Sequence, residues 1–99
     1  MTELRRTVGG GEDWVEFKPS GYPFKLRKQL QGNDDEAVLG IILPFVTGCS
    51  LTRADGTKLE KVTSIEDVAD VDEKTVTDII WRFYEFRADR MREPLPKNS

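Results

Sequence analysis

Residues 50–80 read SLTRADGTKLEKVTSIEDVADVDEKTVTDII and contain the signals of a hairpin followed by a capped helix. Asp55-Gly56 predicts a two-residue turn, because such a turn needs positive φ at both central positions and favours Asn or Asp followed by Gly. Leu51 and Leu59 flank this short polar ribbon. Asp72 predicts a helix start, since its carboxylate can accept hydrogen bonds from the free N–H groups of the first turn. The stretch combines strands with a helix, which indicates an α+β fold.

The helix after Asp72 is predicted to be amphipathic and to close the domain. Its apolar face consists of Val76, Ile79, Ile80, Phe83, Tyr84 and Phe86. Trp81 lies off this face, so it either closes the edge of the domain or touches a partner. Before this helix, Ser64 with Glu66 and Asp67 predicts a short capped helical turn over residues 64–69.

A second main helix is predicted in the middle of the chain. Asn33 or Asp34 can cap it, and residues 38–46 supply its apolar stripe at Val38, Ile41, Ile42 and Phe45. Leu39, Leu43 and Val46 widen the stripe over most of the circumference. Such a helix is either central in the domain or covered by another chain. Pro44 is expected to bend or end it, because proline removes a backbone donor.

The first part of the chain has weaker signals. Residues 1–13 are polar, include three successive glycines and show no period, so we expect a flexible N-terminal arm. Residues 14–17 favour a strand, and alternation over residues 22–30 favours its hairpin partner. An alternative is that Pro23 sits in the first turn of a helix that runs through Leu30.

Length and composition limit the organisation. The 99 residues, 37% hydrophobic and 33% charged, fit a small single α+β domain over residues 14–91 with one or two β-hairpins and two main amphipathic helices. Residues 92–99 are then a short polar C-terminal tail. The net charge of −3 argues against a nucleic-acid partner, because phosphate binding needs a clustered basic face.

The same composition argues against metal binding and catalysis. The chain has one cysteine, Cys49, and no histidine, so we expect no disulfide, metal site or cofactor and no activated catalytic thiol. No pair of acids stands out by spacing, and we expect a protein that is not an enzyme. The longest apolar run, residues 38–46, is far shorter than the ~20 residues that cross a bilayer, and the N-terminus lacks the apolar segment of a secretory signal.

The order of these elements resembles that of small tail proteins of long-tailed bacteriophages. The resemblance rests on Ile41-Ile42-Leu43, the segment LTRADG at residues 51–56, the cap at residues 63–66 and the helix from Asp72. Over residues 14–87 the chain is most similar to the tail assembly chaperones, which combine a short β-rich N-terminus, a helix, an LT-x-x-DG hairpin and a closing amphipathic helix. Pro44 and the arginine-rich helix end depart from the usual pattern.

The resemblance implies a non-enzymatic protein of the host cytoplasm. Such a chaperone coats the tape-measure protein, keeps its apolar helices soluble and recruits tail-tube subunits. The alternatives are a structural tail or head-completion component that stays in the particle, and an acidic DNA mimic or regulator-binding protein. Self-association into a homo-oligomer is left open.

Partner contacts are predicted from the surplus of apolar side chains alone. The candidate partner-binding residues are Ile41, Ile42, Phe45, Trp81 and Phe86. Together they exceed what one small core requires, and a groove for another helix would use such a surface. The competing expectation is that the N-terminal aromatic residues cover it within the monomer, namely Trp14, Phe17, Tyr22 and Phe24.

Overall fold

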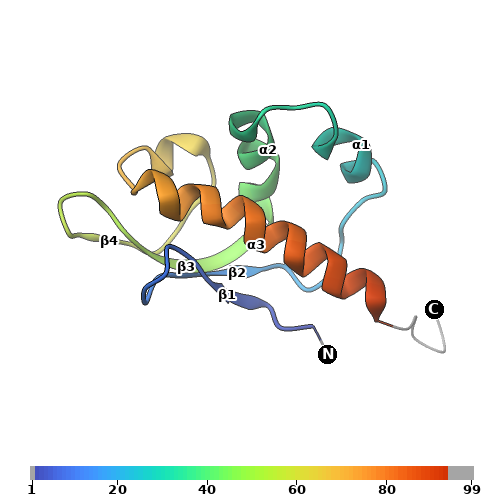
Figure 1. Ribbon diagram of the computed structural model, residues 1–99, viewed down its shortest axis with the longest axis horizontal. Helices are drawn as coiled ribbons and strands as arrows, with labels where there is room; N and C mark the ends of the chain where they lie inside the picture. Colours follow the sequence, from blue (N-terminus) through green and yellow to red (C-terminus); the bar gives the residue numbers. More distant parts are fainter. Residues whose placement is uncertain (1, 94–99) are drawn as a thin grey trace.

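The structure, a computed structural model, describes residues 2–93 and has the predicted α+β architecture (Figure 1). An antiparallel sheet lies behind and below the long last helix, and the two shorter helices lie above it. In chain order the elements are β1 Arg5–Thr7, β2 Trp14–Phe17, α1 Leu26–Leu30, α2 Asp35–Ile42, the 3₁₀ turn η1 Leu43–Phe45, β3 Val46–Thr52, β4 Lys58–Leu59, the 3₁₀ turn η2 Ile65–Val68 and α3 Glu73–Arg92. Residues 94–99 of the predicted C-terminal tail lie outside the described residues.

The sheet has the order β1-β2-β3-β4 and contains the predicted second hairpin. Leu51 of β3 faces Leu59 of β4. The turn itself differs from the prediction. Among the turn residues only Gly56 has positive φ, at +89°, and its N–H donates to the Arg53 carbonyl over 2.9 Å. The connection is therefore a three-residue loop with glycine in the left-handed position, and Asp55 instead accepts from the Thr57 backbone N–H at 3.0 Å.

The predicted caps are present at three helical starts. Asp34 accepts from the Ala37 N–H, Asp72 accepts from the Lys74 N–H, and Ser64 forms a capping box with Asp67. The expectation that Pro44 bends or ends the helix predicted over residues 38–46 is confirmed. α2 stops at Ile42, Pro44 lies in the first turn of η1, and Val46 already begins β3. Proline is tolerated there because the first N–H groups of a helical turn need no partner.

The predicted hairpin between residues 14–17 and 22–30 is wrong, and the helical alternative is confirmed. Pro23 precedes α1, and its carbonyl accepts from the Leu26 N–H at 3.0 Å. Leu26 and Leu30, one helical turn apart, are both buried while Lys28 between them is exposed, whereas an alternating strand would place all three on one face. β2 pairs instead with β1 and with β3.

The predicted flexible arm is wrong for the described part of residues 1–13. β1 pairs with β2, and Val8 is fully buried. The turn that follows lies against α3, where the Gly9 N–H donates to Asp78 at 2.8 Å and a Cβ at Gly9 would lie 2.5 Å from the Thr75 hydroxyl oxygen. These contacts join groups far apart in sequence, so no local sequence pattern predicts them.

The core lies between the inner face of the sheet and α3. Its largest fully buried side chains include Phe17 from β2 and Phe83 and Phe86 from α3. The Phe17 ring centroid lies 5.3 Å from that of Phe83 and 5.2 Å from that of Phe86. No helix within residues 2–93 has the length and apolarity needed to cross a bilayer.

We expect Ile80→Asp to unfold the domain. Ile80 is 6% exposed, and an unpaired carboxyl group there costs on the order of 3–5 kcal/mol, which is comparable with the roughly 5 kcal/mol at the lower end of the range for small domains. Trp81→Asp is the matched control, because that neighbouring side chain is 62% exposed. Urea unfolding followed by circular dichroism measures both variants. Equal midpoints for the two would show that the buried face of α3 is assigned wrongly.

A second prediction concerns Asp13, which joins the β1–β2 loop to β3 and β4. Its carboxylate accepts from the Thr52 N–H at 3.0 Å and the Thr52 hydroxyl at 2.9 Å, and Lys58 lies 3.2 Å away. Burial alone would raise the pKa of this carboxyl group, but the hydrogen bonds from Thr52 and Lys58 outweigh it and hold the pKa below its ordinary value of 3.8.

A carboxyl group whose pKa is lower in the folded state stabilises the fold above its unfolded pKa, and this stabilisation is lost as the pH falls through the folded pKa. We therefore expect Asp13→Asn to lower the melting temperature at pH 7 by a few degrees, with the difference shrinking below about pH 4. Melting curves from pH 2.5 to 7 test this, with the neighbouring exposed Glu12→Gln as control. A difference that stays constant over this range contradicts the prediction.

Candidate functional site

The predicted partner-binding residues do not form one surface. Ile42 is fully buried and Phe86 is 1% exposed, so neither side chain can meet a partner while the domain keeps this fold. Ile41 and Phe45 are half-buried against the core. Trp81 alone of the set is largely exposed, at 62%. Trp81 therefore does not close the edge of the domain.

The expectation that N-terminal aromatic residues cover the apolar surface is confirmed for two of them. Phe17 lies in the core, and the Tyr22 ring lies 4.8 Å from Phe45. The other two lie elsewhere. Trp14 lies half-buried on the outer face of the sheet, with the Arg5 guanidinium 3.7 Å from its ring centre, and Phe24 is 83% exposed.

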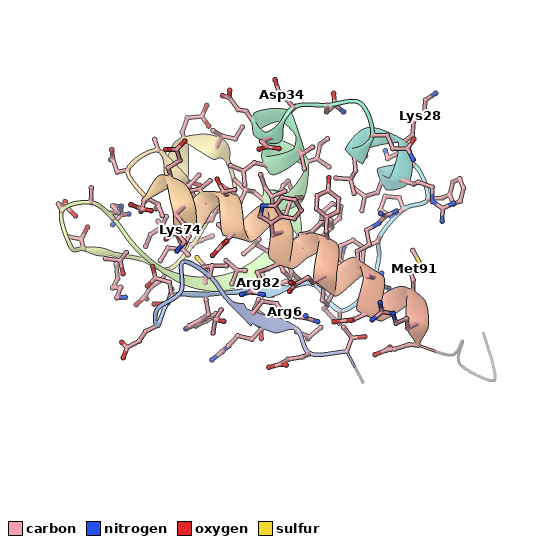
Figure 2. The ribbon with its side chains drawn as sticks, in the orientation of Figure 1. Arg6, Lys28, Asp34, Lys74, Arg82 and Met91 are labelled. Atoms are coloured by element: carbon pink, nitrogen blue, oxygen red, sulfur yellow. The ribbon has the colours of Figure 1, made fainter. Side chains whose placement is uncertain are left out.

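The exposed face of α3 carries a second apolar row, which we call the outer stripe. It consists of Thr77, Trp81, Tyr84, Ala88 and Met91. The spacings of four, three, four and three residues are those of the a and d positions of a coiled coil. Trp81 and Met91 are 62% and 63% exposed, Ala88 is exposed, and the other two are half-buried. Figure 2 shows Met91 near the C-terminal end of this helix.

The outer stripe is bordered on the β1 side by charges that already have partners. Arg82 forms an ion pair with Glu85 at 2.9 Å and donates to the Thr7 carbonyl, and Arg6 pairs with Asp89 at 2.9 Å (Figure 2). Asp89 also lies 3.4 Å from Arg92. Because these charged groups already pair within the chain, we do not assign them a role in binding a partner.

On its other side the outer stripe adjoins a shallow apolar hollow near its N-terminal end. This hollow has a volume of about 240 Å³ and lies between α2, η2 and α3. Thr77 belongs to both the stripe and the hollow. The side chains that line the hollow include Leu39, Ile65, Val68, Val76 and Ile80. An apolar side chain that reached over the stripe would find contacts there.

Sequence reasoning found Trp81 but missed the rest of the outer stripe. The helical period predicts Tyr84 on the buried face, and the pattern marks Met91 only as the end of the domain. The signal was present in the spacing of residues 77, 81, 84, 88 and 91. It was hidden because the stronger apolar row at Ile79, Ile80, Phe83 and Phe86 lies on the same helix.

Groups suited to catalysis or metal binding are sparse. Within residues 2–93 no cluster of three or more Cys, Asp or Glu side chains could hold a metal ion. Cys49 is buried in β3, where its thiol lies 3.6 Å from the Leu59 carbonyl. Burial raises the pKa of this thiol to about 11, and the charge of Glu60 acts in the same direction. The thiolate that a nucleophile requires is thus disfavoured.

Comparison of the chain with protein-family models, with curated proteins and with solved structures finds no match.

We expect Cys49 to react slowly with a thiol reagent such as DTNB. At pH 8 the native protein should be labelled at least about 100-fold more slowly than the protein in denaturant, because both burial and the raised pKa suppress the thiolate. In the control, Cys49→Ala is combined with Ser50→Cys, which moves the thiol to the outer face of the sheet. Rapid labelling of native Cys49 would contradict the assignment of an inert core residue.

Proposed function

We propose that this protein is a non-enzymatic tail assembly chaperone of the long-tailed phage type, which acts in the host cytoplasm and binds a helical segment of the tape-measure protein along the outer stripe. The observation that supports this role is the coiled-coil spacing of exposed apolar residues on α3, with Trp81 62% and Met91 63% exposed. The resemblance of the sequence to the tail chaperones supplies the identity of the partner. Recruitment of tail-tube subunits belongs to the same proposal.

The outer stripe has a length suited to a helical partner. Thr77 to Met91 spans 14 residue steps, which at 1.5 Å per residue is about 21 Å, or four helical turns. A partner helix with apolar residues at the same 3.5-residue period would follow this row without drifting off it. The hollow beside Thr77 would accept one of its side chains. Burial of apolar surface at roughly 25 cal/mol per Å² would then drive binding.

This mode of binding has a distinct salt dependence. Apolar burial is little screened by ions, whereas a contact with phosphates weakens steeply as salt rises. We expect the complex with the tape-measure segment to survive washing at high salt.

Co-expression with a tape-measure fragment encoded by the same genome tests the proposal. We expect the fragment to become soluble and to co-purify at both low and high salt. Ala88→Asp, which places a charge in the middle of the outer stripe, should reduce co-purification at least tenfold. Ala54→Asp makes the same change at an exposed position in the β3–β4 turn and should have no effect. Trp81→Phe, which keeps most of the apolar surface, should retain binding.

Two outcomes contradict the proposal. Equal loss of binding in Ala88→Asp and Ala54→Asp would show that the outer stripe is not the binding surface. If the fragment stays insoluble and unbound while the protein is stoichiometric in finished particles, the alternative of a structural tail or head-completion component replaces the chaperone.

A further inference from the structure

A second surface, which we call the basic hollow, lies at the other side of the C-terminal half of α3. It has a volume of about 190 Å³ and opens between the segment before α1, α1 itself and α3. Its apolar lining includes Phe83 and Phe86, which are fully buried or nearly so, and Tyr22, which is half-buried. The hollow therefore reaches down to the aromatic core.

The rim of the basic hollow exposes large apolar side chains. Phe24, which precedes α1, is 83% exposed, and Met91 of α3 is 63% exposed. Together with the half-buried Tyr22 ring, these side chains give the hollow an accessible apolar lining, which is the form of a pocket that takes one apolar anchor from a partner.

The charges around the basic hollow all have one sign. Its charged lining residues are Arg27, Arg87 and Arg90. Lys25, just before α1, and Lys28 on α1 add positive charge, and Figure 2 shows Lys28 projecting from that helix. No acidic residue occurs between Phe17 and Asp34 in the sequence, although the whole chain has a net charge of −3. Positive charge is thus concentrated at one end of an acidic protein.

These arginines have no carboxylate partner within the part of the chain that the structure describes. The Arg27 guanidinium instead lies 5.2 Å from the centre of the Phe24 ring, and that of Arg90 lies 4.6 Å from the centre of the Tyr22 ring. Both are held beside the aromatic surface, with their charge available. Guanidinium groups held in this way favour planar carboxylates as partners.

We propose that the basic hollow binds an acidic peptide segment of a partner protein, with one apolar side chain packed against Tyr22, Phe24 and Met91 and flanking carboxylates paired with Arg27, Arg87 and Arg90. Charge complementarity selects the acidic flanks, and the accessible apolar surface selects the apolar anchor. A nucleic acid would also pair with the arginines and stack a base on an exposed ring, but the net charge of −3 disfavours a polyanion, so it is the competing occupant in the test. The basic hollow shares only Met91 with the outer stripe, and the proposal does not depend on the tape-measure assignment.

Fluorescence anisotropy with labelled peptides tests this proposal on the full chain. The probe is a peptide in which Leu-Phe is flanked on each side by three Asp or Glu residues. We expect it to bind at least tenfold more tightly than a peptide with Ser-Ser at the centre, and at least tenfold more tightly than one with Asn and Gln flanks. Binding should weaken as salt rises, since exposed charges are screened. A thymidine oligonucleotide of equal charge is the competing probe.

Variants separate the basic hollow from the rest of the surface. Arg27→Glu and Phe24→Ser change exposed side chains, so both variants should fold, and each should weaken binding of the acidic peptide at least fivefold. Trp81→Ser, on the outer stripe, should leave it unchanged. Amide chemical shifts provide a second measurement, with changes expected in α1 and the last turns of α3.

The proposal is overturned by any of three results: equal binding of the neutral-flanked peptide, unchanged binding in Arg27→Glu, or tighter binding of the oligonucleotide. Analytical ultracentrifugation tests self-association. If the protein sediments faster as its concentration rises and Arg27→Glu abolishes this effect, the occupant of the hollow is a second copy of this chain instead. Loss of peptide binding in Phe24→Ser with retained tape-measure binding would separate this site from the proposed chaperone function.

Discussion

The packing of α3 on the inner face of the sheet is the contact on which the other elements depend. Phe83 and Phe86 meet Phe17 of β2 at ring-centroid distances of 5.3 and 5.2 Å, and all three rings are buried. α1 and α2 are short, at five and eight residues, and isolated helices of this length are not stable in water. They hold their conformation because α3 and the sheet provide the apolar surface on which they pack.

Polar contacts then attach the N-terminal segment to the same helix. Gly9 donates to Asp78, Arg82 donates to Thr7, and Arg6 pairs with Asp89, so the segment follows α3 along much of its length. These groups pair with one another rather than with water, which leaves the apolar outer stripe as the unpartnered part of the helix surface. The surface of α3 consequently consists of a buried face, a face paired with the β1 segment and an exposed apolar row.

The two proposed interaction surfaces differ in chemistry although both include α3. The outer stripe has a repeating apolar pattern along about four turns, which suits a long helix. The basic hollow has an accessible apolar lining at Tyr22, Phe24 and Met91 and a set of arginines, which suits a short segment with a single anchor. Met91 lies between them and belongs to both, so a partner on one surface would come close to the other.

The elements whose signals are local can be predicted from the sequence. The caps at Asp34, Ser64 and Asp72 were predictable because a side chain of that type satisfies backbone donors within the same turn. The hairpin across Leu51 and Leu59 was predictable because alternation and a glycine turn lie within a few residues. The buried face of α3 followed from its helical period, and Trp81 could be placed off that face for the same reason.

Features that rest on contacts between residues distant in sequence depend on the tertiary structure. β1 has a polar, aperiodic sequence and exists because β2 and α3 supply its partners. Pro44 by itself predicts the end of α2, but the start of β3 at Val46 reflects the pairing of β3 with β2, whereas the apolar run continues through Val46. Burial of Ile42 and Phe86 removed two predicted contact residues, because a periodic apolar row does not distinguish a core from an interface. That distinction depends on which surface the rest of the chain already covers.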